Sequence, residues 1–418
     1  MRVLFQNVEL CFPGSELHGK VLDVLLEYGK VKAIDSNIEE APRTKIVSGG
    51  VLAPGFVDIG CFGGEPGFEH RETRSSLVKA ASKGGYTHVY ILPNLDPVTD
   101  NKAAVQFIEN HEDVVQLHAL GAISQGLKGM DLADIYDMHR NGVSAFTDGM
   151  LSIQDTGLMK RALEYVKAFD GIVINQPYDY GIEPEGVVHE SVVSTKMGLK
   201  GIPALAEISM LKRDLDLLEY TDSRLIAHNI STGFGTSLIN EAKKKNLSVY
   251  ASVALMNLIE NDTSVETFDT HYLLNPPLRS ESDRKTLVKS LKNGIIDAIV
   301  SGHMPLEKDL KTVEFGHAEP GVATLPFVFP VLFDKLQKFL SLEDLVGLLS
   351  NGPRRMLGLE SVEIQVGSEV DYVWLDLEKE TSYSPKDFPS KSINSPFLNQ
   401  KWKGNVNGVF RGDQYLLF

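Results

Sequence analysis

The stretch PGFVDIGCFGGEPGFEHRET, residues 54–73, decides the fold of this 418-residue chain, because an apolar run here passes directly into a glycine-rich polar loop. Such runs are typical of strands that are buried on both faces, as in a parallel sheet. We therefore expect eight parallel strands, from VLAPGFVDIG (51–60), HVYILPN (88–94), QLHALGAIS (116–124), GVSAFTDG (142–149), GIVINQPYD (171–179), RLIAHNIS (224–231), SVYASVAL (248–255) and DAIVSGHMP (297–305).

Amphipathic stretches such as SSLVKAASKGG, LADIYDMHRNG, TGLMKRALEYVKAF and TSLINEAKKKN separate these runs. Several end on Gly or Asn, which favours helix termination by a left-handed residue. Eight strand–helix units over roughly 250 residues predict an α/β fold, a (β/α)₈ barrel of the TIM type. A doubly wound open sheet is the alternative, but no GxGxxG motif opens a helix after the first strand.

The two ends of the chain have a different pattern. Residues 1–50 and 360–418 contain short apolar runs with turns between them, and GK at 29–30 and GD at 412–413 are typical of hairpin turns. Neither piece is long enough to bury a good core alone. We expect them to join as one small β-sandwich domain, with the barrel at 51–359 inserted between them.

Composition and charge exclude several classes of protein. The formal charge is −15, without a basic stripe, which argues against nucleic-acid binding. Cys11 and Cys61 are the only cysteines, so neither a zinc finger nor a disulfide framework is expected, and a reducing, cytoplasmic location is predicted. We find no signal peptide and no apolar run near the ~20 residues of a membrane span.

Reactive groups of a (β/α)₈ barrel lie at the carboxyl ends of its strands. Those ends supply Asp148, Asp179, His228 and His303, with Cys61 as a candidate soft ligand. A hydrolytic metal site needs three or more His, Asp, Glu or modified Lys side chains that converge. Four scattered candidates are too few for a two-metal site, but a single weak metal site stays open.

A nucleophilic mechanism is also weakly supported. Cys61 lies near His70 in sequence, an arrangement that more often reflects packing, and no GxSxG motif occurs. Ser231 and Thr232 follow a strand, where hydroxyls commonly cap the next helix. Because side chains alternate along a strand, only one of His228 and its neighbour is expected to face the barrel interior.

Six motifs in order resemble those of the long-form dihydroorotases of the amidohydrolase superfamily, over almost the whole chain. PGFVDIGCFGGEPGFEHRET resembles PGFxDxHxHxREPG followed by Glu-Thr, and LPNLDPVTD resembles MPNTxPxxD. AFTDG, NISTGFG, NPPLRSESDRKTL and DAIVSGHMPL resemble FTDDG, HVST, NPPLRxxxDRxAL and DAIATDHAPH. The tail SPKDFPSKSINSPFLNQKWKG is similar to the closing segment of that family.

The resemblance implies zinc-dependent, reversible cyclisation of carbamoyl aspartate to dihydroorotate, but most of the implied catalytic positions have changed. Where the family has metal-ligating histidines and the catalytic aspartate, this chain has neutral residues at Gly60, Phe62, Gln176, Asn229, Met256 with Asn257, and Gly302. Asp148 remains in the segment of the bridging carboxylate, although one of two adjacent aspartates is missing, and His303 also remains. We therefore expect no zinc and no other cofactor.

The implied substrate contacts are half lost. Gly64 stands where the family has a carboxylate-binding Arg, and Leu306 replaces a His. Asn94 and Asn275 match substrate-contacting asparagines, although Asn also suits such turns for backbone reasons.

Three hypotheses follow. The first is a dihydroorotase-like pseudoenzyme in pyrimidine biosynthesis, a homodimer that acts by binding. Its expected partner is aspartate carbamoyltransferase, since inactive chains of this family are known to scaffold that enzyme. The second is an active cyclic amidohydrolase with a rearranged metal site built from Asp148, His228 and His303. The third is a sensor that binds an acid through Asn94, Asn275 and the Gly321 loop. We also expect Phe62 and Met256 to fill the former metal cavity.

Overall fold

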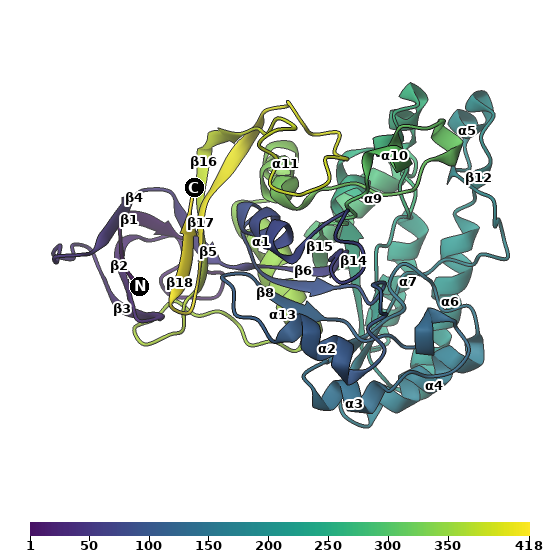
Figure 1. Cartoon of the computed structure of the whole chain (residues 1–418), viewed down its shortest axis with the longest axis horizontal. Helices are drawn as coiled ribbons and strands as arrows, with labels where there is room; N and C mark the ends of the chain where they lie inside the picture. Colours follow the sequence, from purple (N-terminus) through teal and green to yellow (C-terminus); the bar gives the residue numbers. More distant parts are fainter.

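The computed structural model describes all 418 residues and contains the predicted barrel of eight parallel strands (Figure 1). Six parallel ladders join the strands into two sheets, and a bridge between Gly121 and Phe146 connects these two sheets. In chain order, the strands are β6 (Phe56–Cys61), β7 (Tyr86–Ile91), β8 (Gln116–Ala119), β9 (Ala145–Phe146), β10 (Ile172–Asn175), β13 (Leu225–Ala227), β14 (Val249–Ala254) and β15 (Ala298–Val300).

A buried carboxylate closes the barrel between its first and last strands. Asp58 in β6 is fully buried and accepts hydrogen bonds from the backbone N–H of Ser301, at 2.7 Å, and from its hydroxyl. The N–H of Phe62 donates to the carbonyl of His303 at 3.1 Å. These bonds replace a regular ladder between β6 and β15.

Helices follow the strands, as the alternating pattern predicted. Left-handed residues end the three quoted stretches that finish on Gly or Asn, at Gly85, Gly142 and Asn246. The helices are α1 (Arg74–Lys83), α2 (Lys102–Glu109), α3 (Ile135–Arg140), α4 (Thr156–Lys167), α5 (Val192–Met197), α6 (Leu205–Thr221), α7 (Gly233–Lys244), α8 (Leu255–Ile259), α9 (Glu281–Lys292), α10 (Lys308–Lys311), α11 (Val328–Leu336), α12 (Leu342–Val346) and α13 (Gly352–Leu357). None is long and apolar enough to cross a membrane.

Both ends of the chain build one curved sheet beside the barrel, in the order β18-β17-β16-β5-β1-β2-β3 with β4 on β1 (Figure 1). Phe5 of β1 packs against Phe410 of β17 at 5.0 Å between ring centroids, so the sheet encloses its own core. Its strands are β1 (Arg2–Leu10), β2 (Val21–Glu27), β3 (Lys30–Asp35), β4 (Lys45–Ser48), β5 (Val51–Pro54), β16 (Asp371–Thr381), β17 (Trp402–Arg411) and β18 (Gln414–Leu417). A two-stranded sheet, β11 (Val188–His189) with β12 (Gly201–Ile202), lies between β10 and α6.

The hairpin turns lie where the sequence predicted them. Tyr28 and Gly29 both have positive φ between β2 and β3, and Gly412 has φ 52° between β17 and β18.

Two segments cross the predicted division at residues 50 and 360. The first apolar run is split, because 51–54 pairs as β5 with β1 and β16, and only β6 enters the barrel. Gly55 lies at the crossing, where a β-carbon would meet Thr87 Oγ1 at 2.2 Å. At the other end, Ser390–Asn394 leaves the terminal sheet and binds loops of the barrel.

Candidate functional site

A cavity of about 270 Å³ opens at the carboxyl ends of the barrel strands. Many positions that sequence singled out line it, although they come from six different loops. These are Gly60, Gln176, His228, Asn229, Met256, Asn257, Asn275, Gly302, His303, Leu306 and Gly321.

Other predicted site residues do not line this cavity. Phe62 is buried and packs on Phe68, with 5.6 Å between ring centroids. Cys61 is buried in the main core, where burial raises the pKa of its thiol well above the usual value. Asp179 accepts a hydrogen bond from the N–H of Gly181 in a turn. The expectation that Phe62 and Met256 fill the cavity is therefore wrong, since Met256 only forms part of its wall.

Asp148 faces away from the cavity, contrary to its expected place among the catalytic residues. Its carboxylate accepts hydrogen bonds from the N–H groups of Ile123 and Ser124, both at 2.9 Å, and from the Ser124 hydroxyl. Burial raises the pKa of this carboxyl. The next residue, Gly149, is the one that lines the cavity, so the position that faces the site carries no carboxylate.

The side chain of Asn94 binds the backbone of the loop that contains Asp148, and it does not line the cavity. Its Nδ2 donates to the carbonyl of Asp148 at 3.1 Å, and its Oδ1 accepts from the N–H of Met150 at 3.1 Å. Both ends of the amide are satisfied by backbone. These contacts fit the interpretation of Asn94 as a residue that stabilises a turn.

His228 occupies space beside Gly60. A β-carbon at position 60 would lie 2.7 Å from His228 Nε2, so a larger residue at 60 would collide with the ring. His228 is only 4% exposed, and burial lowers the pKa of its imidazole to about 4. The ring is therefore neutral at physiological pH.

The hydrogen bonds of Ser252 fix the tautomer of His228. The Ser252 hydroxyl accepts from the N–H of Asn229 at 3.1 Å and lies 2.9 Å from His228 Nδ1. Ser252 is fully buried, and Nδ1 is the only acceptor within reach of its proton. Leaving that proton unpaired would cost about 1–3 kcal/mol. Nδ1 is therefore the acceptor, and Nε2 carries the ring proton toward the cavity.

His303 is held in the same tautomer. Its Nδ1 accepts from the N–H of Thr324 at 3.0 Å, so its proton lies on Nε2, which is 3.5 Å from the carboxylate of Glu72. Burial alone would raise the pKa of Glu72, but the His303 ring and the Ser390 and Ser76 hydroxyls outweigh it and lower that pKa. Neither histidine presents a free ring nitrogen lone pair to the cavity.

Side-chain amides form a chain along one wall. Asn229 Nδ2 donates to Gln176 Oε1 at 3.0 Å, and Gln176 Nε2 donates to Asn275 Oδ1 at 3.1 Å. Asn257 Nδ2 donates to the carbonyl of Pro277 at 3.1 Å. This directionality leaves the Oδ1 atoms of Asn229 and Asn257 and the Nδ2 atom of Asn275 without protein partners, and Asn229 Oδ1 is buried.

His228 and Asn229 both line the cavity, which contradicts the alternation argument. β13 ends at Ala227, and Asn229 has φ 55°, so the chain has already left the extended conformation. The strand rule does not apply beyond the last paired residue.

The two positions where a carboxylate-binding side chain was expected, Gly64 and Leu306, cannot bind a carboxylate. Gly64 has φ 75°, and a β-carbon there would lie 2.3 Å from the carbonyl oxygen of Glu72, so no side chain fits. Leu306 places an alkyl group on the wall. One arginine does reach the cavity, Arg71, but its Nε lies 2.7 Å from the carboxylate of Glu307.

Zinc does not fit these donors. Nowhere in the chain do three His, Cys, Asp or Glu side chains converge as a metal-binding group. Around the cavity, Asp148 points elsewhere and both histidines carry their proton on Nε2, while the remaining donors are neutral amides and the single carboxylate of Glu319. Amide oxygens bind Zn²⁺ poorly.

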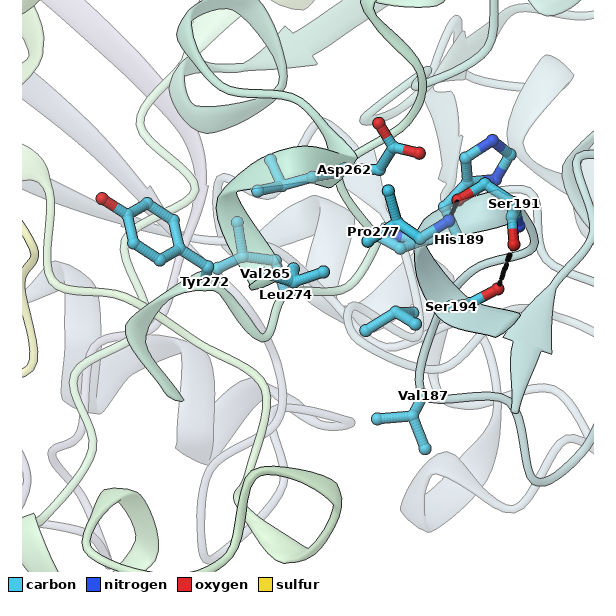
Figure 2. A pocket seen from close by; sticks show the side chains of 12 residues that line it. Val187, His189, Ser191, Ser194, Asp262, Val265, Tyr272, Leu274 and Pro277 are labelled. Atoms are coloured by element: carbon cyan, nitrogen blue, oxygen red, sulfur yellow. Dashed lines mark hydrogen bonds between the residues drawn. The ribbon is translucent and has the colours of Figure 1, made fainter. Parts of the chain in front are cut away.

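A second hollow lies between α5 and the loop at 262–278 (Figure 2). Its volume is about 0 Å³ for a water-sized molecule. Several of its polar groups are paired within the protein: Ser191 and Ser194 cap α5, and His189 Nδ1 lies 3.2 Å from Arg279. This hollow is packed protein and not a ligand site.

Sequence reasoning missed three residues of the site. Ser252 is one polar residue in an apolar strand sequence. Arg71 lies within the quoted stretch 54–73, but no role was expected for it. Gly149 was passed over because Asp148 beside it carries the conspicuous charge. The expectation for Thr232 is confirmed, since its hydroxyl accepts from the N–H of Gly235 and caps α7.

Comparisons with known proteins agree with this fold. A family model described as "Dihydro-orotase-like" matches residues 49–233. The chain is 37% identical over 391 residues to a dihydroorotase of Thermoanaerobacter sp. (strain X514), covering 92% of this chain and 90% of that protein. It is 35% identical over 412 residues to a dihydroorotase of Syntrophotalea carbinolica, covering 97% and 96%.

Solved structures with the same fold are more distant in sequence. The L-hydantoinase (dihydropyrimidinase) from Arthrobacter aurescens superposes with a TM-score of 0.85 at 23% identity, covering 99% of this chain and 96% of that one. The dihydropyrimidinase from Brevibacillus agri NCHU1002 gives 0.83 at 20% identity, covering 100% and 95%.

Proposed function

This chain belongs to the dihydroorotase family, and we propose that within it the chain is a pseudoenzyme, a structural or regulatory component of pyrimidine biosynthesis. In this proposal, the chain has the fold of the family but lacks its metal-dependent chemistry. Hydrolysis or closure of a cyclic amide needs a polarised carbonyl and an activated water, and a metal ion supplies both in one step.

One observation carries the proposal: the cavity wall has a single anionic side chain, Glu319, and no imidazole with a free ring nitrogen lone pair, which is too few ligands for a catalytic metal. His228 and His303 both carry their proton on Nε2, and the position beside Asp148 that faces the cavity is Gly149. The substitutions at Gly60, Gln176, Asn229, Met256 and Gly302 remove ligands from separate loops, so no single change restores the site.

The active alternative, with a rearranged site of Asp148, His228 and His303, is less well supported. Asp148 is saturated by the loop at 123–124, and His303 is held between Thr324 and Glu72. These three side chains form no common metal-binding group.

Metal content and turnover, measured on the same preparation, test the proposal. We expect sub-stoichiometric zinc, manganese and cobalt after purification without chelator, and no dihydroorotate hydrolysis above the buffer rate with added Zn²⁺. Stoichiometric metal together with turnover that a chelator abolishes would overturn the proposal and establish the alternative.

We further propose aspartate carbamoyltransferase as the binding partner, and a cytoplasmic homodimer as the form that binds. This step rests on the behaviour of inactive family members and on the chain composition. Size-exclusion chromatography with light scattering, on each protein and on their mixture at micromolar concentration, tests it. A co-eluting complex is expected, and two independent peaks would contradict the partnership while leaving the loss of catalysis standing.

A further inference from the structure

We propose that the cavity at the strand ends binds a small uncharged carboxamide, without a metal ion, and discriminates against the corresponding carboxylate. This inference rests on the proposed loss of metal chemistry and adds a binding activity to it. The recognising groups are His228 Nε2–H and Asn275 Nδ2 as donors, with Asn257 Oδ1 as the acceptor.

The unpaired groups of the cavity provide the first argument. Buried polar atoms are nearly always hydrogen-bonded, and an orphaned one marks a missing partner. His228 is 4% exposed, yet its Nε2–H makes no hydrogen bond within the protein. Asn257, which is 5% exposed, lines the same cavity, and its Oδ1 accepts no hydrogen bond within the protein. The cavity thus holds a donor without an acceptor and an acceptor without a donor.

A carboxamide supplies both partners on one planar group. Its carbonyl oxygen accepts from His228 Nε2–H, and its N–H donates to Asn257 Oδ1, on the lining of the same cavity. A carboxylate has acceptors only, so it would place an oxygen against Asn257 Oδ1 and leave that atom unsatisfied.

The charges around the cavity also disfavour an anion. The single cation on its wall, Arg71, is already paired with Glu307 at 2.7 Å between Nε and the carboxylate. Glu319 lies on the wall as well, and no side chain fits at Gly64. A bound carboxylate would have to break the Arg71–Glu307 pair or remain uncompensated, which is costly away from water.

Size and lining set the rest of the ligand. Pockets for drug-sized molecules are about 300–1,000 Å³, so a cavity of about 270 Å³ suits a smaller molecule. Apolar side chains face the amide-rich wall, among them Leu92, Met256, Leu306 and Val322. A primary amide on a single ring, such as benzamide, matches both surfaces.

Benzamide and benzoate form a matched pair of probes, because they differ only in the group that the site should distinguish. Saturation-transfer NMR and isothermal titration calorimetry on the purified full chain, in buffer with EDTA, measure binding of each. We expect benzamide to bind and benzoate to bind at least about tenfold more weakly. Equal binding of the two, or no binding of benzamide, would overturn the inference.

A pair of histidine variants tests the site. His228→Phe keeps a ring but removes the donor, and it should weaken benzamide binding about tenfold, since one buried hydrogen bond is worth about 1–3 kcal/mol. His111→Phe changes an exposed histidine whose ring makes no hydrogen bond, and it should bind as the unaltered chain does. Unchanged binding by His228→Phe would remove the assigned donor and with it the inference.

The tautomer can be read without any variant, in case His228→Phe does not fold. In ¹⁵N spectra of histidine-labelled protein, we expect His228 to show a protonated Nε2 and an unprotonated Nδ1. The opposite tautomer would overturn the assignment. Stoichiometric zinc in the preparation would instead defeat the proposed loss of metal chemistry, whereas a metal-free chain that ignores benzamide defeats only this inference.

Discussion

The imidazole of His228 takes the space that a side chain at Gly60 would need: a β-carbon there would lie 2.7 Å from Nε2 and 3.1 Å from Cε1. Gly60 also has φ 87°, a backbone conformation that other residues adopt with strain. The absence of a side chain at position 60 and the placement of His228 are thus parts of one arrangement. Restoring a ligand at position 60 requires the neighbouring ring to move.

Gly60→Ala should therefore destabilise the chain more than its backbone strain alone. Gly14→Ala is the matched control, because Gly14 has φ 89° and nothing within 4 Å of its missing β-carbon. Both variants bear about 1–3 kcal/mol of conformational strain, and only the first meets His228. Chemical denaturation should give the larger loss for Gly60→Ala, and His228→Ala should reduce the difference. Equal losses in the two single variants would contradict the contact.

The closing tail holds the loops of the cavity through Asn394. Its Nδ2 donates to the carbonyls of Met304 and Gly321, at 2.9 and 3.3 Å, and its Oδ1 accepts from the N–H of Leu306 at 3.1 Å. Asn394→Ala would leave these buried backbone groups unpaired, with an expected loss of about 3 kcal/mol in the free energy of unfolding.

Urea denaturation of Asn394→Ala beside Asn110→Ala measures this loss. Asn110 is an exposed asparagine at the end of α2, and its replacement should change stability by less than about 0.5 kcal/mol. Faster hydrogen exchange at 302–322 in Asn394→Ala would locate the effect. A loss spread evenly over the chain would show that the tail does not act on these loops.

The fold could be predicted from sequence because its signals are local and repeated. Continuous apolar runs that alternate with amphipathic stretches predict the eight strand–helix units. The same signal could not place Val51–Pro54, since a run of buried residues looks alike in the terminal sheet and in the barrel. Pairing of β5 with β1 and β16 is a long-range property that composition does not encode.

The residues that line the site could be predicted from the sequence, but the directions of their side chains could not. Sequence placed Gln176 and Asn229 at strand ends and Asn275 in the NPP turn, and all three line one cavity. It did not show that Asp148 turns away, because that depends on the two N–H groups at 123–124 that attract its carboxylate. Nor could residue order reveal the hydroxyl of Ser252 beside His228, which decides where the ring proton lies.

Closure of the barrel depends on the carboxylate of Asp58. Asp58→Ala would remove the acceptor for the N–H and hydroxyl of Ser301 and open a small cavity, with an expected loss of about 3 kcal/mol. Asp58→Asn keeps the shape and one acceptor oxygen. Because burial raises the pKa of Asp58, the neutral amide also avoids a charge that the interior disfavours. The midpoint temperature of thermal unfolding of Asp58→Asn should therefore be well above that of Asp58→Ala. The reverse order would contradict this account.

Part of the acid sensitivity should come from the opposite end of the barrel, where His88 joins the strands to the terminal sheet, in addition to the contribution of buried His228. Its Nε2 lies 3.0 Å from Asp371 Oδ2 and its Nδ1 lies 2.9 Å from His118 Nε2, while Arg354 pairs with Asp371 at 2.5 Å.

Burial is the largest single influence on the pKa of His88 and on the pKa of Asp371. It lowers the pKa of His88 below 6.5, with Asp371 acting in the opposite direction. Burial would raise the pKa of Asp371, but His88 and Arg354 outweigh it and hold that pKa well below 3.8. In both cases the unfolded chain binds protons more readily than the folded one.

Stability should consequently fall as the pH drops through 6.5, where unfolded His88 gains a proton, and fall further below 3.8, where unfolded Asp371 does. Each proton contributes a slope of at most about 1.4 kcal/mol per pH unit. His88→Gln removes the first titration, so its free energy of unfolding, measured in urea from pH 7.5 to 5, should depend less on pH than that of the unaltered chain. His111→Gln, at an exposed site, is the control and should keep the original slope. Identical slopes for all three proteins would show that His88 is not an acid-sensitive group.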